Sequence, residues 1–348
     1  MKAQKEAKLL FMRRALELAK RGGKKTRPNP RVGCVLVKDG KIIAEAWHKK
    51  FGAPHAEALA LKKAGPKAYG ASAYITLEPC VSFPGKKTPS CAEALISAKV
   101  KKVVIASQDP NPHISGRGIK LLKKNGILVQ TGLLQEECEK INRGFFWRQR
   151  HQRPYVILKL ALSLDGKAFA AGGNSQWITD KPARRAAHIL RSHCDAILVG
   201  IETVIKDDPS LTAHGMGSNP LRVILDTDLR IPKTARVLGA QARTLIFTAS
   251  PKNITGIEVV RVSQSKGRLN IKEVLRELAK RGVETLLVEG GPTVCAAFLK
   301  ENLAEEAYFF IAPKFLSGTQ NPNHSPRLED PQLEKIGKDF LIHGKIRY

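Results

Sequence analysis

Residues 71–80 read ASAYITLEPC, an apolar run that ends in Glu-Pro-Cys. Its β-branched and aromatic side chains, and the turn-forming proline after them, predict a strand over 71–77. Apolar residues at helical spacing flank this strand, over 55–63 before it and 91–98 after it. A strand between two helices of this length is typical of a layered α/β domain.

The alternation of helices and strands extends in both directions from this strand. Upstream, apolar runs at 32–38 and 41–47 are joined by Asp39-Gly40, which predicts a hairpin with a type I′ turn. The remaining elements predicted for the first half are helices at 5–21, 119–125 and 134–149 and strands at 102–107 and 127–131. Together they fit one layered domain.

A domain boundary is predicted at 149–154, where a basic stretch runs into Pro154, because proline cannot continue a helix. The elements predicted beyond it are strands at 155–162, 196–199, 222–225, 244–247 and 285–289, helices at 181–192 and after 291, and loops at 215–219 and 314–327. A length of 348 residues suits two domains of ordinary size. We therefore expect two α/β domains, 1–150 and 151–348.

The composition excludes several classes of protein. Hydrophobic residues make up 43% and charged residues 26%, which excludes a globally disordered chain. No apolar run approaches the roughly 20 residues of a membrane span, and the N-terminus lacks the apolar region of an export signal. Six cysteines are too few for a disulfide scaffold and suggest metal binding or catalysis. We expect a cytoplasmic protein with no membrane partner.

The net charge of +28 suggests at first a nucleic-acid partner. The charge is uneven, because residues 1–150 hold 31 Lys and Arg against 11 Asp and Glu, whereas 151–348 hold 28 against 20. Lysines such as Lys24, Lys62 and Lys123 coincide with no motif. We interpret most of the excess as a solvated, lysine-rich surface and do not expect the protein to bind nucleic acid.

A histidine and two cysteines have the pattern of a catalytic zinc site. His55 and Cys91 each open a predicted helix, and Cys80 follows the strand. One imidazole and two thiolates suit Zn²⁺ with a fourth position open to water, and Glu57 can shuttle protons beside it. On a regular helix, residues i and i+2 lie about 200° apart, so His55 and Glu57 can converge only at the first turn. The alternative is a helix-capping histidine with two buried cysteines, but the combined pattern is the zinc-deaminase signature.

The first half resembles the deaminase domain of bifunctional riboflavin-biosynthesis proteins. The resemblance is carried by PNPRVG at 28–33, HAE at 55–57, TLEPC at 76–80, TPSC at 88–91, DPNP at 109–112 and GRG at 116–118. It implies a cytidine-deaminase-like, three-layer α/β/α domain with zinc on His55, Cys80 and Cys91 and with Glu57 as the proton shuttle. It also implies that Asn29, His48 and Lys159 contact the pyrimidine substrate, Lys159 reaching across from the second domain.

One segment departs from the family pattern. After the first cysteine, the family usually has Ser-His-x-Gly-Lys/Arg-Thr-Pro-Pro-Cys, whereas residues 81–91 read VSFPGKKTPSC, two residues longer and without the histidine. A loop between metal ligands tolerates insertions, so zinc binding is expected to persist. The substrate phosphate is expected to contact Lys86 or Lys87. A protein in which only the second half is active remains an alternative.

The second half contains a second candidate site at 289–293, where Glu-Gly-Gly-Pro-Thr separates a predicted strand from a helix. Glycines after a strand let backbone N–H groups approach a phosphate, and a helix N-terminus favours the anion. An ordinary strand–helix turn is the alternative, and the absence of G-x-G-x-x-G argues against a standard dinucleotide fold.

The second half resembles the riboflavin-pathway reductase domain, which is similar to dihydrofolate reductase. The matching segments are LKLALSLDGK at 158–167, SQWIT at 175–179, GIETV at 200–204, DDPSLT at 207–212 and VEGGPT at 288–293. The resemblance implies an NADPH site lined by Ala161, Trp177, Thr203, Asp207, Thr227, Gly291, Pro292, Thr293, Val294, Cys295, Ala296 and Ala297. The substrate positions that it implies are Ser175, Arg191, Leu211, His214 and Glu289.

Two further features concern phosphate binding and the end of the chain. The guanidinium of Arg191 suits the substrate phosphate, whereas His214 stands where the family often has a second arginine and would weaken phosphate binding at neutral pH. The chain is also expected to stop, at Arg347-Tyr348, before a final strand that family members commonly carry.

We therefore interpret the chain as a bifunctional enzyme. The first half is expected to be a zinc hydrolase that deaminates a phosphorylated pyrimidine, and the second half an NADPH-dependent reductase, in a homo-oligomer. A tRNA deaminase is the alternative, but such enzymes usually show P-C-x-x-C, whereas Cys80 and Cys91 are 11 apart. An RNA-binding protein on a degenerate scaffold would have lost Glu57 or a zinc ligand, and all are present.

Overall fold

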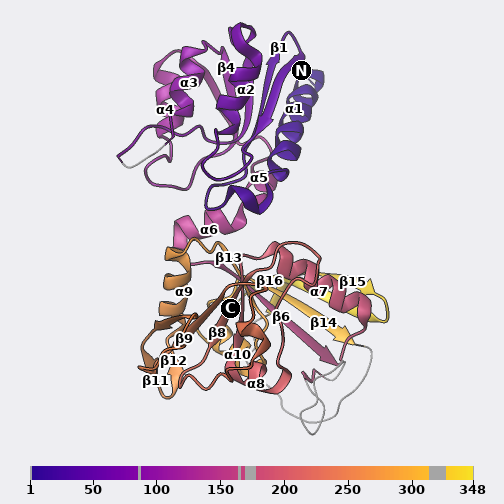
Figure 1. Cartoon of the computed structure of the whole chain (residues 1–348). Helices are drawn as coiled ribbons and strands as arrows, with labels where there is room; N and C mark the ends of the chain where they lie inside the picture. The colour runs from indigo at the N-terminus through magenta and orange to yellow at the C-terminus, as the bar shows by residue number, and fades with distance from the viewer. Residues whose placement is uncertain (1, 85–87, 164–165, 169–177, 313–326, 348) are drawn as a thin grey trace. The chain divides into compact units, whose positions relative to one another are not determined.

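The computed structural model describes residues 2–84, 88–163, 166–168, 178–312 and 327–347 (Figure 1). The chain forms two compact units, Met1–Gln152 and Arg153–Tyr348. Among the described residues, no helix is both long and apolar enough to cross a membrane.

The first unit is built on a five-stranded sheet of order β2-β1-β3-β4-β5. Its strands are β1 (Gly33–Lys38), β2 (Lys41–Trp47), β3 (Ser72–Leu77), β4 (Lys102–Ser107) and β5 (Leu128–Thr131). β1 pairs antiparallel with β2 and β3, and β3, β4 and β5 are parallel. Asp39 and Gly40 both have positive φ, 49° and 73°, as the type I′ turn predicted between β1 and β2 requires.

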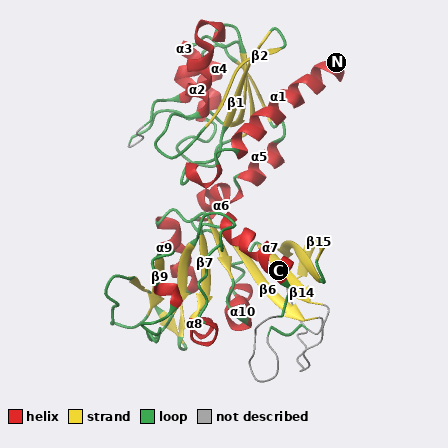
Figure 2. Cartoon of the chain, turned by 45° about the vertical axis from the view of Figure 1, so that its right-hand side comes forward, coloured by secondary structure: helices red, strands yellow, loops and turns green. Residues whose placement is uncertain are grey.

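Helices cover both faces of this sheet (Figure 2). α1 (Lys2–Lys20) and α5 (Gln135–Ile141) pack on one face, and α2 (Ala56–Ala64), α3 (Cys91–Ser97) and α4 (Arg117–Lys124) pack on the other. Alternate residues of β1 bury themselves on opposite sides, Leu36 toward α2 and Val35 toward α1. The unit is therefore the three-layer α/β/α domain expected from the sequence.

The single helix predicted over 134–149 is wrong, because Asn142 divides it into α5 and α6 (Arg143–His151). The buried side chain of Asn142 accepts a hydrogen bond from the N–H of Arg31 and donates one to its carbonyl, both at 2.9 Å. The periodicity of the sequence could not show this break, because the bonding partner lies 111 residues away.

The second unit is built on a nine-stranded sheet of order β10-β9-β8-β7-β13-β6-β14-β16-β15. Its strands are β6 (Tyr155–Ser163), β7 (Ala196–Gly200), β8 (Leu221–Leu225), β9 (Thr244–Thr248), β10 (Glu258–Arg261), β13 (Thr285–Val288), β14 (Glu306–Ala312), β15 (Arg327–Ile336) and β16 (Asp339–Arg347). The strands from β10 to β14 are parallel, and β16 and β15 are antiparallel. β11 (Gln264–Ser265) and β12 (Arg268–Leu269) form a separate hairpin.

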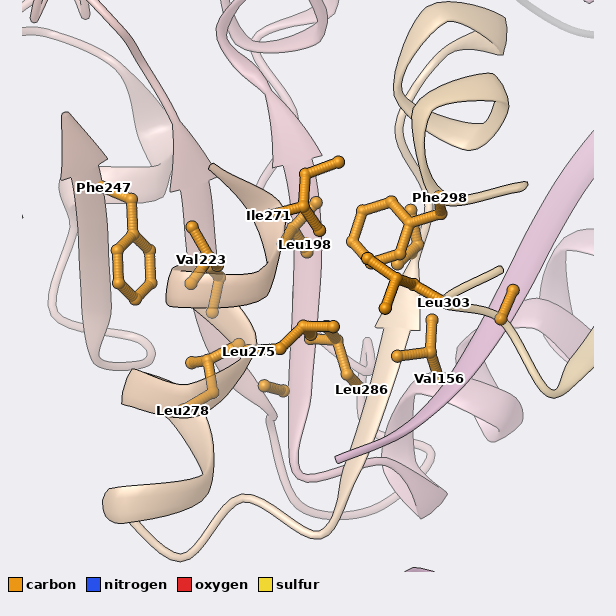
Figure 3. Close-up of a cluster of buried hydrophobic side chains, with 14 of the residues drawn as sticks. Val156, Leu198, Val223, Phe247, Ile271, Leu275, Leu278, Leu286, Phe298 and Leu303 are labelled. Carbon is orange, nitrogen blue, oxygen red and sulfur yellow. The ribbon is translucent and has the colours of Figure 1, made fainter. Parts of the chain in front are cut away.

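The parallel strands are apolar on both sides because helices cover both faces. On one face, α9 (Ile271–Lys280) and α10 (Pro292–Lys300) close the largest apolar cluster of the unit. Side chains of this cluster labelled in Figure 3 are Val156, Leu198, Val223, Phe247, Ile271, Leu275, Leu278, Leu286, Phe298 and Leu303. On the other face, α8 (Ile201–Asp207) packs on β7, and α7 (Lys181–His193) packs on Phe310 and Leu341.

The expectation that the chain stops before a final strand is wrong. β16 reaches Arg347 and pairs with β14, so it joins the parallel part of the sheet to the edge strand β15. Sequence patterns also missed α8, α9, β10 and β14. Of the loop predicted at 314–327, residues 314–326 lie outside the described residues, and Arg327 already belongs to β15.

One buried cation lies inside the second sheet. The side chain of Arg222 on β8 is fully buried, and burial lowers its pKa. Its terminal nitrogens donate hydrogen bonds to four backbone carbonyls, those of Ser210, Arg236, Gly239 and Ala242, while Nε has no partner. Arg222 thus ties the loop that follows α8 to the segment before β9 without any carboxylate.

We expect Arg222→Met to lower the free energy of unfolding of the second unit by about 2–4 kcal/mol, because four buried carbonyls lose their donor. Urea unfolding followed by near-UV circular dichroism measures the change. Arg243→Met is the matched control, because its side chain is 84% exposed and its ion pair with Glu258 contributes little. An unchanged unfolding midpoint in Arg222→Met would contradict the structural role.

Candidate active sites

Three residues with metal-binding side chains meet where β3 ends and two helices begin. His55 is the N-cap of α2, Cys80 follows β3, and Cys91 is the first residue of α3. His55 Nδ1 lies 3.5 Å from Cys80 Sγ and 3.3 Å from Cys91 Sγ, and the three ligand atoms lie within 4.8 Å of one another. In the part of the chain that the structure describes, this is the one such group of three or more His, Cys, Asp or Glu.

The geometry of this cluster fits Zn²⁺. A tetrahedral zinc with bonds of about 2.3 Å to sulfur and about 2.0 Å to nitrogen separates the sulfur from the nitrogen by about 3.5 Å. The hydrogen bond from Cys91, followed by the interactions with His55, lowers the pKa of the Cys80 thiol to about 3. Cys80 is therefore held as the thiolate, which is the form that binds metals.

The backbone joins the two cysteines directly despite the longer segment between them. The carbonyl of Cys80 accepts hydrogen bonds from the Ser90 hydroxyl at 3.2 Å and from the Ala92 N–H at 3.1 Å. The same Ser90 hydroxyl caps α3 by accepting from the N–H of Glu93 at 3.1 Å. These hydrogen bonds hold the two ends of the segment between the cysteines together, and they do not depend on the length of that segment. Lys86 and Lys87 lie outside the described residues.

Glu57 reaches the cluster because His55 is not part of the helix. The N-cap backbone of His55 is extended, with φ −69° and ψ 163°, so the 200° separation of a regular helix does not apply. Glu57 is 3% exposed, and its carboxyl interacts with Cys91. Burial raises its pKa, which suits a group that takes up and releases a proton.

Asn29 and His48 lie beside the cluster. His48 Nδ1 is 3.2 Å from the Pro54 carbonyl, which can only accept, so Nδ1 carries the ring proton. Burial lowers the pKa of His48, and Nε2 of the neutral ring accepts from the Asn29 amide at 3.3 Å. The rings of His48 and His55 meet edge to face, 5.3 Å apart. The structure thus brings both predicted substrate residues next to a predicted metal ligand.

Sequence reasoning assigned no role to Glu78, although it stands in the matched segment. Its buried carboxylate accepts hydrogen bonds from the N–H groups of Asp109, Gly116 and Ile119, at 3.0–3.2 Å. A Cβ at Gly118 would lie 2.1 Å from the Pro79 carbonyl oxygen, so only glycine fits there. Glu78 therefore holds the turn before Cys80 against the start of α4.

The second unit has a buried ionic centre on the carboxylate that follows β13. Glu289 accepts two hydrogen bonds from Arg191 on α7, at 2.7 and 3.0 Å, and one from Lys159 on β6 at 3.3 Å. Burial alone would raise the pKa of Glu289, but the charges of Arg191 and Lys159 outweigh it and lower the pKa to about 2. The structure thus brings three predicted substrate residues together. The expected contact of Lys159 with the deaminase substrate stays a prediction.

Leu211 and His214, also predicted to contact substrate, lie on the loop that approaches α7. Arg191 donates to the Thr212 carbonyl at 3.1 Å, and the His214 ring stacks on that of His188 with centroids 4.2 Å apart. Leu211 and His214 have φ of 51° and 46°, a region that costs energy for residues other than glycine. His188 was missed, although it shares a face of α7 with Arg191, three residues away.

The residues predicted for the cofactor gather at the carboxyl ends of parallel strands. They are Ala161 near the end of β6, Thr203 and Asp207 on α8 after β7, Thr227 after β8, and residues 291–297 at the start of α10 after β13. This edge of a parallel sheet is where such folds bind ligands. Ser175 and Trp177 lie outside the described residues.

The start of α10 has the space that a phosphate needs. A Cβ at Gly290 would lie 2.6 Å from Cβ of Val294, so Gly290 is required for packing. A Cβ at Gly291, the N-cap, would meet nothing within 4 Å. Open space at a helix N-terminus, where N–H groups lack intrahelical partners, suits the pyrophosphate of a dinucleotide.

Comparisons with known proteins match both units. Residues 154–342 match the family described as RibD C-terminal domain, and residues 5–107 match the cytidine and deoxycytidylate deaminase zinc-binding region. The riboflavin biosynthesis protein RibD of Aquifex aeolicus is 41% identical over 349 residues, which cover 96% of this chain and 97% of the relative. The protein of the same name from Escherichia coli is 39% identical over 360 residues, covering 96% and 98%.

Solved structures match over the same length. Acinetobacter baumannii RibD is 36% identical, with a TM-score of 0.88 over 99% of this chain and 100% of the other. A diaminohydroxyphosphoribosylaminopyrimidine deaminase/5-amino-6-(5-phosphoribosylamino)uracil reductase from Thermotoga maritima is 37% identical, with the same TM-score and coverage. Fold and sequence similarity therefore extend across both units.

We expect Cys91→Ser to weaken zinc binding by more than about tenfold, because one of three protein ligands is lost. Metal analysis after dialysis should give about one zinc per chain for the unaltered protein and much less for the variant. Cys138→Ser is the control, because Cys138 is buried in α5, outside the cluster. Full zinc content in Cys91→Ser would show that the cluster is not the metal site.

Proposed function

Because the chain belongs to the RibD family, the bifunctional deaminase/reductases of riboflavin biosynthesis, we propose that its two candidate sites catalyse the two reactions. Residues 1–150 hydrolyse 2,5-diamino-6-ribosylamino-4(3H)-pyrimidinone 5′-phosphate to release ammonia, and residues 151–348 reduce the ribosyl group to ribityl with NADPH. The observation that carries the proposal is the convergence of Glu57 with His55, Cys80 and Cys91, in a chain that also has the Glu289 centre.

In the deaminase site, the residues divide the work of binding and proton transfer. His55, Cys80 and Cys91 would hold a zinc ion, which would lower the pKa of a water molecule and supply a nucleophile at neutral pH. Glu57 would take a proton from the attacking water and deliver it to the departing amine, so that water and an amino group become a carbonyl and ammonia. Burial raises the pKa of Glu57, which makes its carboxylate a better proton acceptor. Asn29 and His48 orient the pyrimidine.

In the reductase site, the protein positions two reactants for hydride transfer. The carboxyl ends of β6, β7, β8 and β13, with the helix N-terminus at Gly291, would hold NADPH, which would supply the hydride. Glu289 and the Thr212 carbonyl hold the plane of the Arg191 guanidinium through three hydrogen bonds, which leaves two of its five N–H groups for the substrate phosphate. This site needs no side chain as an obligatory acid, and most of its effect is proximity.

We also propose a cellular location and an oligomeric state from the membership of the RibD family. The protein works in the cytoplasm, where NADPH and the phosphorylated pyrimidine are available, and it forms a homo-oligomer. A tRNA deaminase is the weaker candidate, because such an activity leaves no use for residues 154–342, which match a reductase domain.

We expect Glu57→Gln to lower the rate of ammonia release by about 10²–10⁴-fold, because the amide cannot carry the proton. NADPH oxidation with the pre-deaminated substrate, followed at 340 nm, should be unchanged, and the zinc content should stay full. Glu93→Gln, an exposed glutamate in the first turn of α3, is the control and should keep both activities. Loss of both activities together in Glu57→Gln would reject the model of two separate sites.

We expect Gly291→Ser to raise the KM for NADPH by about tenfold, because its side chain enters the space assigned to the pyrophosphate. Serine is a good N-cap, so the melting temperature should not fall. Gly290→Ala is the contrasting variant, because its Cβ meets Val294 and should cost about 1–3 kcal/mol of stability. An unchanged KM for NADPH in Gly291→Ser would remove the cofactor from this helix N-terminus.

A further inference from the structure

The two histidines stacked at the reductase site come from different elements. His188 is half-buried on α7, on the helix face that also carries Arg184 and Arg191, and His214 is exposed on the loop. Their ring centroids are 4.2 Å apart and their planes are inclined by 25°. Nε2 of His214 lies 3.3 Å from the hydroxyl of Ser210. His214 therefore covers His188 from the solvent side.

Several contacts fix the loop that carries His214 against α7. A Cβ at Gly217 would lie 2.9 Å from Cβ of Ser192, so glycine permits the close approach of loop and helix. Arg191 holds the Thr212 carbonyl, and Arg222 holds the carbonyl of Ser210. The ring stack is thus part of an anchored loop, and its geometry does not depend on an exposed side chain alone.

The charges that face the stack are mostly positive. Arg191, Lys159 and Glu289 face His188, and Arg191 and Arg236 face His214. Glu289 already neutralises one of the two cations it binds, which leaves the centre with a net positive charge. Burial, and after it Arg191, lowers the pKa of His188 to about 4, and the same two causes lower that of His214. Both rings are therefore neutral at pH 7 in the free protein.

We propose that the His188–His214 stack is the proton-dependent arm of the substrate's phosphate site: a phosphate monoester that binds beside Arg191 is accompanied by one proton on the stack. This proposal rests on the proposed reductase function and adds His188 to its site. A dianion next to the rings reverses the effect of Arg191 and makes an imidazolium favourable, through a charge-assisted hydrogen bond. Only one proton is taken up, because two imidazolium rings in contact repel each other.

The affinity for the substrate phosphate is expected to depend on pH in one direction. The stack is neutral when the site is empty and protonated when phosphate is bound, so binding takes up a proton and weakens as pH rises. The loss can reach about tenfold per pH unit for one proton. A phosphate monoester has a second pKa near about 6 and is fully dianionic above about pH 7. A change in KM above that pH therefore belongs to the protein.

The test measures KM and kcat of the reductase for the pre-deaminated substrate, at saturating NADPH, between about pH 7 and 8.5. We expect KM of the unaltered protein to rise severalfold over this range while kcat changes by less than about twofold. His214→Arg should give a low KM that does not vary with pH, because a guanidinium stays charged. The double variant His188→Gln/His214→Gln should give a high KM that does not vary with pH, because no ring remains to take the proton.

His193→Gln is the matched control, because His193 is exposed on the same helix and should leave the pH profile unchanged. Calorimetric titration at about pH 7.5 with ribose 5-phosphate, a monoester that is mostly dianionic at that pH, in two buffers of different ionisation enthalpy counts the proton directly, near one for the unaltered protein and near zero for the double variant His188→Gln/His214→Gln. A flat KM profile in the unaltered protein, or the same slope in the double variant His188→Gln/His214→Gln, overturns the proposal. NADPH oxidation at saturating substrate in every variant would still support the reductase function, whereas its absence from the unaltered protein would reject that function.

Discussion

A carboxylate buried at the end of a parallel strand must have partners, because its desolvation is otherwise too costly. Each unit has such a group directly after a central strand, Glu78 after β3 and Glu289 after β13. Glu78 is satisfied by backbone N–H groups, and Glu289 by two cationic side chains. The partners of Glu289 are themselves predicted site residues, whereas those of Glu78 are backbone groups that hold the turn before Cys80 in place.

Glu78 and Glu289 have different kinds of partner, and each kind suits the chemistry of its own site. Backbone amides bring no net charge, so the turn that carries Cys80 is held without a cation that would compete with a metal. At Glu289, the partners are themselves the binding groups, and the carboxylate sets their orientation. Arg191 is thereby fixed before a ligand arrives, which reduces the ordering cost of binding.

Local patterns predicted the central elements and the clustering of His55, Cys80 and Cys91. The apolar runs of β1 and β3, the Asp39-Gly40 turn and the grouping of His55 with two cysteines were all readable from short segments. Helical periodicity could not predict how His55 and Glu57 converge. His55 is the N-cap of α2 and its backbone is extended, so the angular spacing of a helix does not apply to it. The residues that lie outside regular structure are those that bring the site together.

Features that depend on distant partners could not be predicted. Nothing near Asn142 indicates that its amide bonds the backbone of Arg31, and nothing near Arg222 indicates that its four acceptors come from two loops. The net charge has the same limitation. Although the chain carries a net charge of +28, the local charge at the reductase site depends on ion pairing. Glu289 binds both Lys159 and Arg191 there but neutralises only one of these two positive charges. A total over the sequence counts charges, whereas binding depends on which of them are already paired.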